Sequence, residues 1–276
     1  MTTAAIQGVR GAFSHAAAID ALGEGVEIVE CRSFEDLFAS VLSSRASHGV
    51  VPVENSLAGS VQRSMDLLLH HPLHVVAEAR VRVRLCLATA PGTDPATIRR
   101  VASHPVALQQ CHRFFARHAG RQAVAAFDTA GSIKELMEGS APYDAAIGSE
   151  LAATLYGATV VERELEDDPD NFTRFLVVAT EPLASPEAPV KTSLVFRLRH
   201  EPGSLHAALG VLASHGVDLT RLESRPIPGR PWEYRFYADV RGPTPTLQAA
   251  AIDALGGVAE EIRVLGRYRE RASLAP

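Results

Sequence analysis

Cysteine is scarce in this sequence, with 3 residues among 276. Cys31, Cys86 and Cys111 are an odd number, stand far apart and match no metal-binding spacing. We expect them to be small buried residues of a protein that works in a reducing compartment.

Long apolar runs and an excess of positive charge are also missing. No stretch reaches the roughly 18 apolar residues of a membrane-spanning helix. The N-terminus lacks the basic and apolar regions of a secretory signal. The net charge is −5 and the pI about 6.1, whereas a nucleic-acid-binding domain is normally basic. We therefore expect a cytoplasmic protein with no nucleic-acid or membrane partner.

The composition is that of a globular protein, with 46% apolar and 21% charged residues. A chain of 276 residues suits two domains. The clearest break is residues 181–190, where three prolines fit neither a helix nor a strand interior. The predicted organisation is a first domain at 1–180, a linker at 181–190 and a second domain at 191–276.

In the first domain short apolar runs alternate with amphipathic stretches, which predicts an α/β domain with a mostly parallel sheet. The candidate strands are Ala4–Gln7, Glu27–Cys31, Gly49–Val53, Val75–Thr89, Arg100–Ser103, Ala123–Asp128, Asp144–Ile147, Thr159–Glu164 and Thr173–Ala179. The candidate helices are Ser14–Leu22, Phe34–Ser43, Val61–Leu69, Pro105–His118, Gly131–Glu138 and Ser149–Tyr156.

The run Val75–Thr89 is too long for one ordinary strand, which indicates a crossover between two lobes. Lobe one is then about 1–75 plus 165–180, and lobe two about 76–164. The second domain has the order βαββαβ, which is the ferredoxin-like order. Its expected elements are Thr192–Leu198, Gly203–Ser214, Val217–Pro226, Tyr234–Val240, Leu247–Leu255 and Glu261–Arg267.

Four polar segments stand at the ends or starts of these strands: Gly8–Ser14, Pro52–Ser60, Ser103–Pro105 and Asp170–Phe175. Glycine lets backbone N–H groups approach a ligand, and a helix N-terminus favours an anion. One such segment is typical of a helix cap, but four together indicate a pocket for a small carboxylate. His70, His71 and His74 fit a helix end better than a metal site.

Together these segments resemble the prephenate dehydratase family. The resemblance rests on the motifs GxxGAFSxxAA (8–18), PVENSxxGSV (52–61), SHPxxxQQC (103–111), DTAG (128–131) and NFTRF (171–175). The second domain resembles an ACT domain, through EPGSL (201–205) and ESRP (223–226). The resemblance implies a two-lobed, periplasmic-binding-protein-like catalytic domain followed by a ferredoxin-like regulatory domain.

The family converts prephenate to phenylpyruvate, water and carbon dioxide, which by its electron count requires no redox cofactor or metal. The resemblance implies that Thr173 is the catalytic residue and donates a hydrogen bond to the departing hydroxyl. It implies substrate contacts for the following residues: Ser14, Asn55, Ser56, Ser103, Gln110, Thr129, Arg174 and Phe175. Arg174 either offsets substrate charge or pairs with Glu166 or Asp167, and Phe175 either packs or positions Thr173.

For the ACT domain the resemblance implies L-phenylalanine as the effector, bound between subunits of a homodimer or homotetramer. A free helix N-terminus at Gly203 and Ser204 suits the effector carboxylate. The expected effector residues are Gly203, Ser204, Leu205, Glu223, Ser224, Arg225 and Pro226, with the strand 223–226 facing the helix start.

The sequence departs from the family pattern at Ala12, Val106 and Asp218. The first two departures bear on substrate contacts, and the third on the effector site. Two alternatives stay open. One is arogenate dehydratase, which performs the same elimination on the aminated substrate, and for which residues around Asp128–Ile133 are the expected determinants. The other is a non-catalytic amino-acid sensor.

Overall fold

The computed structural model describes residues 1–184 and 190–271. The expected linker at 181–190 therefore lies partly outside the described residues, as do residues 272–276 of the second domain. The chain forms two compact units. The first unit is Met1–Leu67 with Ala79–Val177, and the second is Leu68–Glu78 with Val178–Pro276.

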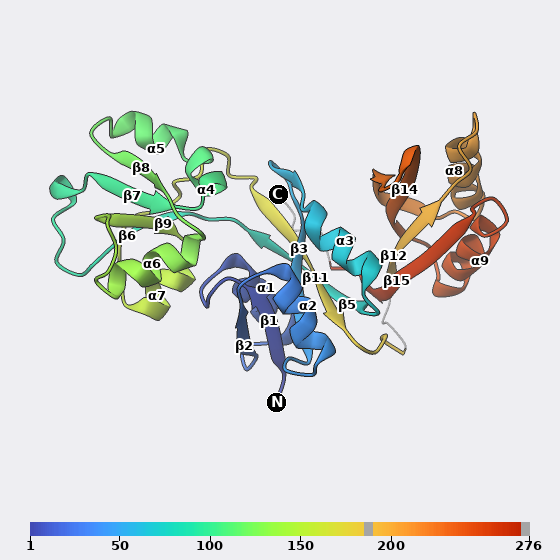
Figure 1. The fold of residues 1–276 in the computed structure, drawn as a ribbon, viewed down its shortest axis with the longest axis horizontal. Helices are drawn as coiled ribbons and strands as arrows, with labels where there is room; N and C mark the ends of the chain where they lie inside the picture. Colours follow the sequence, from blue (N-terminus) through green and yellow to red (C-terminus); the bar gives the residue numbers. More distant parts are fainter. Residues whose placement is uncertain (185–189, 272–276) are drawn as a thin grey trace. The chain divides into compact units, whose positions relative to one another are not determined.

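The first sheet has the strand order β2-β1-β3-β11-β5, with the short β4 paired to β3 (Figure 1). Its strands are β1 (Thr3–Gln7), β2 (Glu27–Cys31), β3 (His48–Asn55), β4 (Gly59–Ser60), β5 (His74–Arg82) and β11 (Phe172–Ala179). β1 runs parallel to β2 and β3, and its apolar centre is fully buried.

Three helices accompany the first sheet: α1 (Phe13–Leu22), α2 (Phe34–Leu42) and α3 (Gln62–His70). The sequence specifies the start of α2 closely. The Ser33 hydroxyl accepts a hydrogen bond from the Asp36 amide, and two acidic residues occupy the first turn, which stabilises the positive end of the helix dipole. α1 ends at Leu22 because Gly23 follows with a positive φ.

The second sheet has the strand order β10-β6-β9-β7-β8. Its strands are β6 (Cys86–Thr89), β7 (Arg100–Ser103), β8 (Gln122–Ala125), β9 (Ala145–Gly148) and β10 (Thr159–Glu162). The helices of this lobe are α4 (Pro105–Gln109), α5 (His112–Arg117), α6 (Thr129–Met137) and α7 (Glu150–Tyr156), with a 3₁₀ turn at Pro95–Thr97.

Strand directions in the second sheet are mixed. β7 pairs in parallel with β8 and β9, whereas β6 runs antiparallel to β9 and β10. The expectation of a mostly parallel sheet is therefore wrong for β6. This strand enters the lobe directly after β5 with no crossover helix, so nothing imposes the parallel direction.

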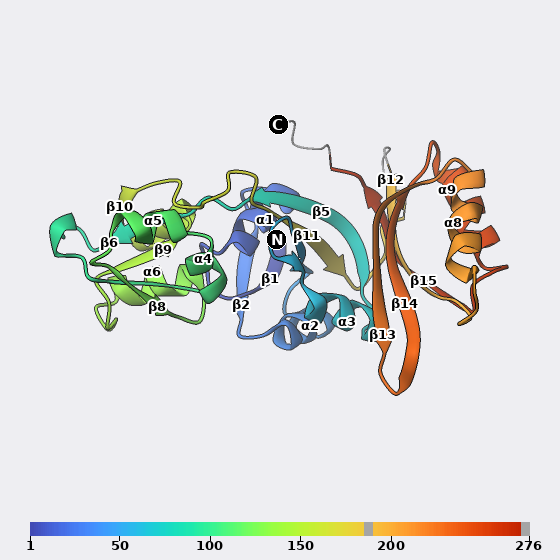
Figure 2. The same ribbon diagram turned by 90° about the horizontal axis from the view of Figure 1, so that it is seen from above.

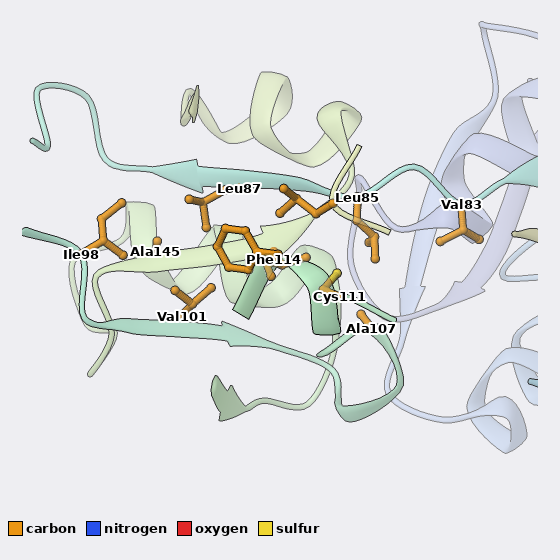
Figure 3. Packing of buried hydrophobic residues seen from close by; sticks show 11 residues of the cluster. Val83, Leu85, Leu87, Ile98, Val101, Ala107, Cys111, Phe114 and Ala145 are labelled. Atoms are coloured by element: carbon orange, nitrogen blue, oxygen red, sulfur yellow. The ribbon is translucent and has the colours of Figure 1, made fainter. Parts of the chain in front are cut away.

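The core of the second lobe gathers around Phe114 of α5 (Figure 3). Its side chain belongs to one buried cluster with Leu87 of β6 and Val101 of β7, and all three side chains are buried. Cys111 belongs to the same cluster, as the sequence predicts for a buried apolar cysteine. Burial of this kind supplies most of the stabilisation of a lobe this small.

The expected helix Pro105–His118 is wrong as a single element, because it breaks at Gln110 and Cys111. The carbonyl of Gln110 accepts from the Asp167 amide instead of a helical partner. The Asp167 carboxylate accepts from the amides of His112 and Arg113 and so begins a new helix. The break leaves Gln110 at the C-terminal end of α4 with its side chain available to the site.

The run Val75–Thr89 divides into β5 and β6, which belong to different sheets. β5 pairs in the first sheet as far as Arg82, whereas lobe two was expected from about residue 76. The domain and lobe bounds themselves stay a prediction. β11 brings the chain back to the first sheet at Phe172, so two segments connect the lobes.

The second unit contains a four-stranded antiparallel sheet in the order β13-β14-β12-β15, which is the ferredoxin-like arrangement (Figure 2). Its strands are β12 (Val190–Arg197), β13 (Asp218–Ile227), β14 (Arg230–Arg241) and β15 (Glu261–Arg269). Both helices, α8 (Ser204–Ser214) and α9 (Pro245–Leu255), pack on one face of this sheet. The predicted α/β fold with a βαββαβ domain is confirmed.

The loop that carries the first motif joins the two lobes. Gly11 has a φ of 87°, and a Cβ at this position would lie 2.6 Å from the Cα of Ala152 in α7. Only glycine fits such a close approach. The Gly11 amide donates to Nδ1 of the buried His15 at 3.0 Å, which requires a neutral ring with its proton on Nε2.

His15 makes the stability of this loop depend on pH. Burial, followed by the nearby Arg10 guanidinium, lowers the pKa of His15 below its ordinary value of 6.5. The unfolded chain therefore binds this proton at a higher pH than the folded chain, so stability is complete above pH 6.5 and falls as the pH drops below it. We predict that His15→Asn, whose carbonyl can still accept from Gly11, flattens this dependence.

The measurement is the thermal unfolding midpoint of the wild type and of His15→Asn between pH 7.5 and pH 5.5. His48, whose pKa burial also lowers, leaves a residual slope in the variant. Equal slopes for the two proteins would contradict the assignment of the effect to His15.

Candidate active site

The side chain of Asn55, at the end of β3, is the centre of the candidate site. Its Oδ1 accepts from the amides of Leu57 and Ala58, at 3.0 and 2.8 Å. These two backbone donors identify this atom as the oxygen and turn Nδ2 towards β11. Nδ2 donates to Asn171 Oδ1 at 2.8 Å and to Thr173 Oγ1 at 3.0 Å, with the Phe172 carbonyl at 3.2 Å.

The contact with Asn55 determines what Thr173 can do. Because the amide nitrogen has no acceptor capacity, the Thr173 oxygen must accept this hydrogen bond. The proton of the Thr173 hydroxyl is then directed elsewhere. Thr173 is half-buried near the start of β11, so its hydroxyl can donate a hydrogen bond to a ligand bound beside it.

Asn171 is a site residue that sequence reasoning missed. It is fully buried, accepts from Asn55 and donates through Nδ2 to Gln110 Oε1 at 2.9 Å. It therefore joins β3 of one lobe to the end of α4 of the other. Its place in the NFTRF motif could have indicated this role. Asparagine is, however, also common in turns next to strands, so the residue type alone did not identify it.

Gln110 and Ser56 belong to this cluster with different roles, and their substrate contacts stay a prediction. Gln110 accepts from Asn171 through Oε1, which leaves its Nε2 hydrogens to face a ligand. The Ser56 hydroxyl donates to the Asp170 carbonyl at 2.7 Å and accepts from the Phe172 amide at 2.9 Å. Ser56 thus holds the turn that presents Thr173, and both of its bonds are to backbone.

Ser103 lies at the end of β7 and is fully buried. Its hydroxyl donates to the carbonyl of Ile147 at 2.6 Å, so it ties β7 to β9. No hydrogen bond of the described residues joins it to the Asn55 cluster. With its proton used, Ser103 can meet a ligand only through its oxygen lone pairs.

Ser14 and Thr129 lie at the starts of α1 and α6, away from the Asn55 hydrogen bonds. Ser14 is buried, and α1 has no side-chain cap at its N-terminus, which leaves backbone donors for a carboxylate. Near Thr129 a cavity of about 490 Å³ has Gly8 and Asp128 in its wall. Burial raises the pKa of Asp128, opposed by the hydrogen bond from the Gly131 amide.

The other two residues of the Thr-Arg-Phe segment differ in their surroundings. Phe175 is 3% exposed, which favours the packing role of the two that the sequence left open. Arg174 is half-buried. Glu166 accepts from the Leu85 amide, and Asp167 accepts from the amides that begin α5. The choice between the two roles of Arg174 stays a prediction.

In the second unit, the start of α8 forms one wall of a cavity of about 130 Å³. Ser204 and Leu205 line this cavity, together with Tyr234 and Phe236 of β14. Gly203 precedes the helix with a φ of 85°, a conformation that glycine adopts without strain. The N-terminus of α8 therefore borders a cavity that β14 also lines.

The expectation that residues 223–226 all face this helix start is wrong for two of them. Ser224 pairs with Phe236 and Pro226 with Tyr234, so both share the face of the sheet that carries the cavity. Glu223 and Arg225 alternate with them and point to the opposite face. The role of all seven residues in effector binding stays a prediction.

Burial raises the pKa of Cys86 and of Cys111 to about 12, so both thiols are protonated and unreactive. Within residues 1–184 and 190–271 no group of three or more His, Cys, Asp or Glu side chains is arranged to hold a metal ion. In the same ranges, every helix is too short or too polar to cross a membrane.

Comparison with known proteins matches both parts of the chain. A family model described as prephenate dehydratase matches residues 4–183, and an ACT domain model matches residues 192–252. Arogenate dehydratase/prephenate dehydratase 2 of Arabidopsis thaliana is 40% identical, over 96% of this chain and 72% of the relative.

Two solved structures have nearly the same fold. Prephenate dehydratase of Arthrobacter aurescens in complex with L-Phe has a TM-score of 0.88 at 32% identity, covering 100% of this chain and 93% of that one. A structure described as GqqA, a novel type of quorum quenching acylase, has a TM-score of 0.87 at 37% identity, covering 96% and 97%. With its family models and motifs in agreement, this chain belongs to the prephenate dehydratase family.

Proposed function

We propose that this protein is a prephenate dehydratase, whose activity L-phenylalanine controls through the ACT domain. The observation that carries the proposal is the hydrogen bond from Asn55 to Thr173 Oγ1. It commits the threonine oxygen to accepting, and so makes the hydroxyl proton available to a leaving group. The family model over residues 4–183 gives the substrate class.

The reaction needs little from the protein beyond positioning and charge. The bond between the ring and its carboxylate breaks, and its electron pair forms the new ring double bond. The neighbouring ring double bond shifts by one position, the carbon–oxygen bond of the ring hydroxyl breaks, and hydroxide leaves with the electron pair of that carbon–oxygen bond. Carbon dioxide, phenylpyruvate and, after uptake of a proton, water are formed. The ring of the product is aromatic, which favours the reaction.

Thr173 acts on the departing oxygen by hydrogen bonding. Its hydroxyl is too weak an acid to give up the proton outright, so we assign the final proton to solvent. A donor aimed at developing charge in a site shielded from water is worth about 10²–10³ in rate. Asn55 holds the threonine directly, and Asn171 and Gln110 extend the same hydrogen-bonded cluster. This pre-organisation avoids rearrangement during the reaction.

The carboxylates of the substrate need donors as well. The uncapped N-terminus of α1, where Ser14 lies, and the Nε2 hydrogens of Gln110 support this role. That Arg174 offsets substrate charge stays a prediction. A local set of such groups attracts a dianion even in a chain whose net charge is −5. A cytoplasmic location remains part of the proposal.

The alternative substrate is arogenate, which carries an ammonium group in place of the keto group. The wall of the 490 Å³ cavity includes Asp128 and Glu135, and such carboxylates favour an amine. Purified protein assayed with each substrate at equal concentration distinguishes the two. A higher kcat/KM for prephenate supports the proposal, and a clear preference for arogenate would overturn it.

An acyl-transfer activity of the kind named for one solved relative is not favoured by this site. A threonine nucleophile needs a base in contact with its hydroxyl. Among the described residues, the hydrogen-bond partner of Thr173 Oγ1 is the Asn55 amide nitrogen, which is a donor. An amide nitrogen cannot take up the proton that a nucleophile must lose.

Thr173→Val keeps the shape of the side chain and removes the donor. We predict that kcat for prephenate falls about 100-fold or more, while the protein stays folded. Thr173→Ser keeps the hydroxyl and retains kcat within about tenfold. Phenylpyruvate formation followed by ultraviolet absorbance is the measurement.

The matched control is Thr180→Val, at an exposed threonine directly after β11. This variant keeps the wild-type rate. Wild-type turnover in folded Thr173→Val would remove Thr173 from the mechanism.

For the regulatory domain, we predict that L-phenylalanine lowers prephenate turnover and that Leu205→Ala weakens this effect. The variant removes apolar area from the wall of the α8 cavity, so the effector concentration for half-inhibition rises at least about fivefold. Titration of initial rates tests this, with Leu247→Ala at the exposed start of α9 as the control. Wild-type protein indifferent to L-phenylalanine would refute the effector assignment.

We further propose that the chain assembles as a homodimer or homotetramer. β13 is an edge strand of ten residues, and its outer backbone groups are available to a second chain. Glu223 and Arg225 point away from the α8 cavity of their own chain, so a site that used all seven effector residues would need another subunit. Sedimentation of the purified protein measures the assembly.

A further inference from the structure

Part of the dehydratase domain packs with the ACT domain in one compact unit. Residues Leu68–Glu78, which comprise the end of α3 and the first half of β5, cluster with residues from Val178 onward. Their partner is the face of the ACT sheet opposite the helices. Thr192 bonds to Gln248 of α9 on the helix side, so its neighbour Lys191 points to the other side.

The central contact on this face is a buried ion pair between Lys191 and Glu78. The Lys191 ammonium lies 2.9 and 3.1 Å from the two carboxylate oxygens of Glu78. The two side chains are 1% and 0% exposed. The backbone amide of Arg271 also donates to Glu78, at 3.0 Å, and Glu270 lies 3.6 Å from the ammonium.

Two further contacts align the same segment with β15. The Arg263 guanidinium donates to the carbonyls of Leu69 and His71, at the C-terminal end of α3. At Gly266 any Cβ would collide with the carbonyl of Val75. The segment is therefore held at its beginning, its middle and its end.

A buried ion pair is a poor source of net stability, because the cost of removing two charges from water offsets their attraction. Its effect is positional. If β12 moves relative to β5, either Glu78 moves with Lys191 or two buried charges lose their partners. The pair thus links the position of β5 to the ACT sheet far more strictly than apolar packing would.

β5 leads directly from this contact to the candidate active site. The amide of Val83, the residue directly after β5, donates to the carbonyl of Asn171 at 2.7 Å. Asn171 is the residue that joins Asn55 to Gln110. The chain of β5 and the residue after it therefore connects the Lys191–Glu78 pair to the groups that hold Thr173.

We propose that the Lys191–Glu78 ion pair couples effector binding in the ACT domain to the active site through β5. The proposal rests on the function proposed above. Coupling requires an element whose position both sites influence. β5 is bound to the ACT sheet at Glu78, and Val83, the residue directly after β5, is bound to the site.

The experiment is a double-mutant cycle on the full chain with Lys191→Met, Glu78→Gln and the double variant. Initial rates with prephenate are measured with and without saturating L-phenylalanine, and L-phenylalanine binding is measured by calorimetry. We expect basal kcat within about threefold of wild type, retained L-phenylalanine binding, and a loss of inhibition of roughly fivefold or more. The double variant loses no more inhibition than the stronger single variant, because both changes remove one interaction.

Thr192→Val is the matched control. It removes the hydrogen bond to the buried Gln248 at the next residue of the same strand, but on the helix side. This variant retains wild-type inhibition. If it loses inhibition as fully as Glu78→Gln does, a general loosening of the ACT domain explains the result and the proposal fails.

Circular dichroism melting checks the fold of each variant. Should Lys191→Met or Glu78→Gln fail to fold, Arg263→Lys is the substitute. Arg263 is half-buried. A lysine at this position lacks the two guanidinium nitrogens that donate to the carbonyls of Leu69 and His71. It is expected to weaken inhibition in the same direction.

Full inhibition in the folded double variant, or in Arg263→Lys where it replaces the cycle, would overturn the coupling role. This result differs from a failure of the proposed function. If the proposed function is wrong, the wild type itself does not convert prephenate or does not respond to L-phenylalanine, and the coupling proposal is then wrong as well.

Discussion

The site depends on one side-chain amide that is oriented by backbone. Asn55 has its oxygen occupied by two amides of its own turn, so its nitrogen has to face Asn171 and Thr173. A rotated amide would leave two backbone donors and the Asn171 oxygen without partners, which is costly in a half-buried site. The direction of the Thr173 proton, and with it the proposed chemistry, follows from this constraint.

Much of the fold could be predicted because local signals agree with it. Short stretches of sequence indicate the apolar strand β1, the cap of α2 at Ser33 and the βαββαβ order. The break between α4 and α5 could not be predicted, because it depends on Asp167, a residue distant in the chain that caps the second helix. The direction of β6 likewise follows from the connection to β5 and not from its own residues.

The candidate site was predicted in its types of residue and less well in their contacts. Motifs indicated Asn55, Gln110 and Thr173, but not that Asn171 joins them, since a buried asparagine is recognised only by what surrounds it. Successive side chains of β13 point to opposite faces of the sheet, so Glu223 and Ser224 lie on different faces. Which face each one occupies follows from the register with β14. Glu78 and Lys191 carry no motif at all. Their partnership between domains appears only when the folded chain buries both charges.

The most direct test of this account is kcat at saturating prephenate for Asn55→Asp. The new carboxylate has the shape of the amide but accepts hydrogen bonds at neutral pH, so it draws the Thr173 proton away from the leaving group. The account predicts a fall in kcat of about 100-fold or more, with a folded protein. A folded variant that keeps kcat within about threefold of wild type would contradict the assignment of Thr173 as a donor held by Asn55, because loss of such a donor lowers the rate far more.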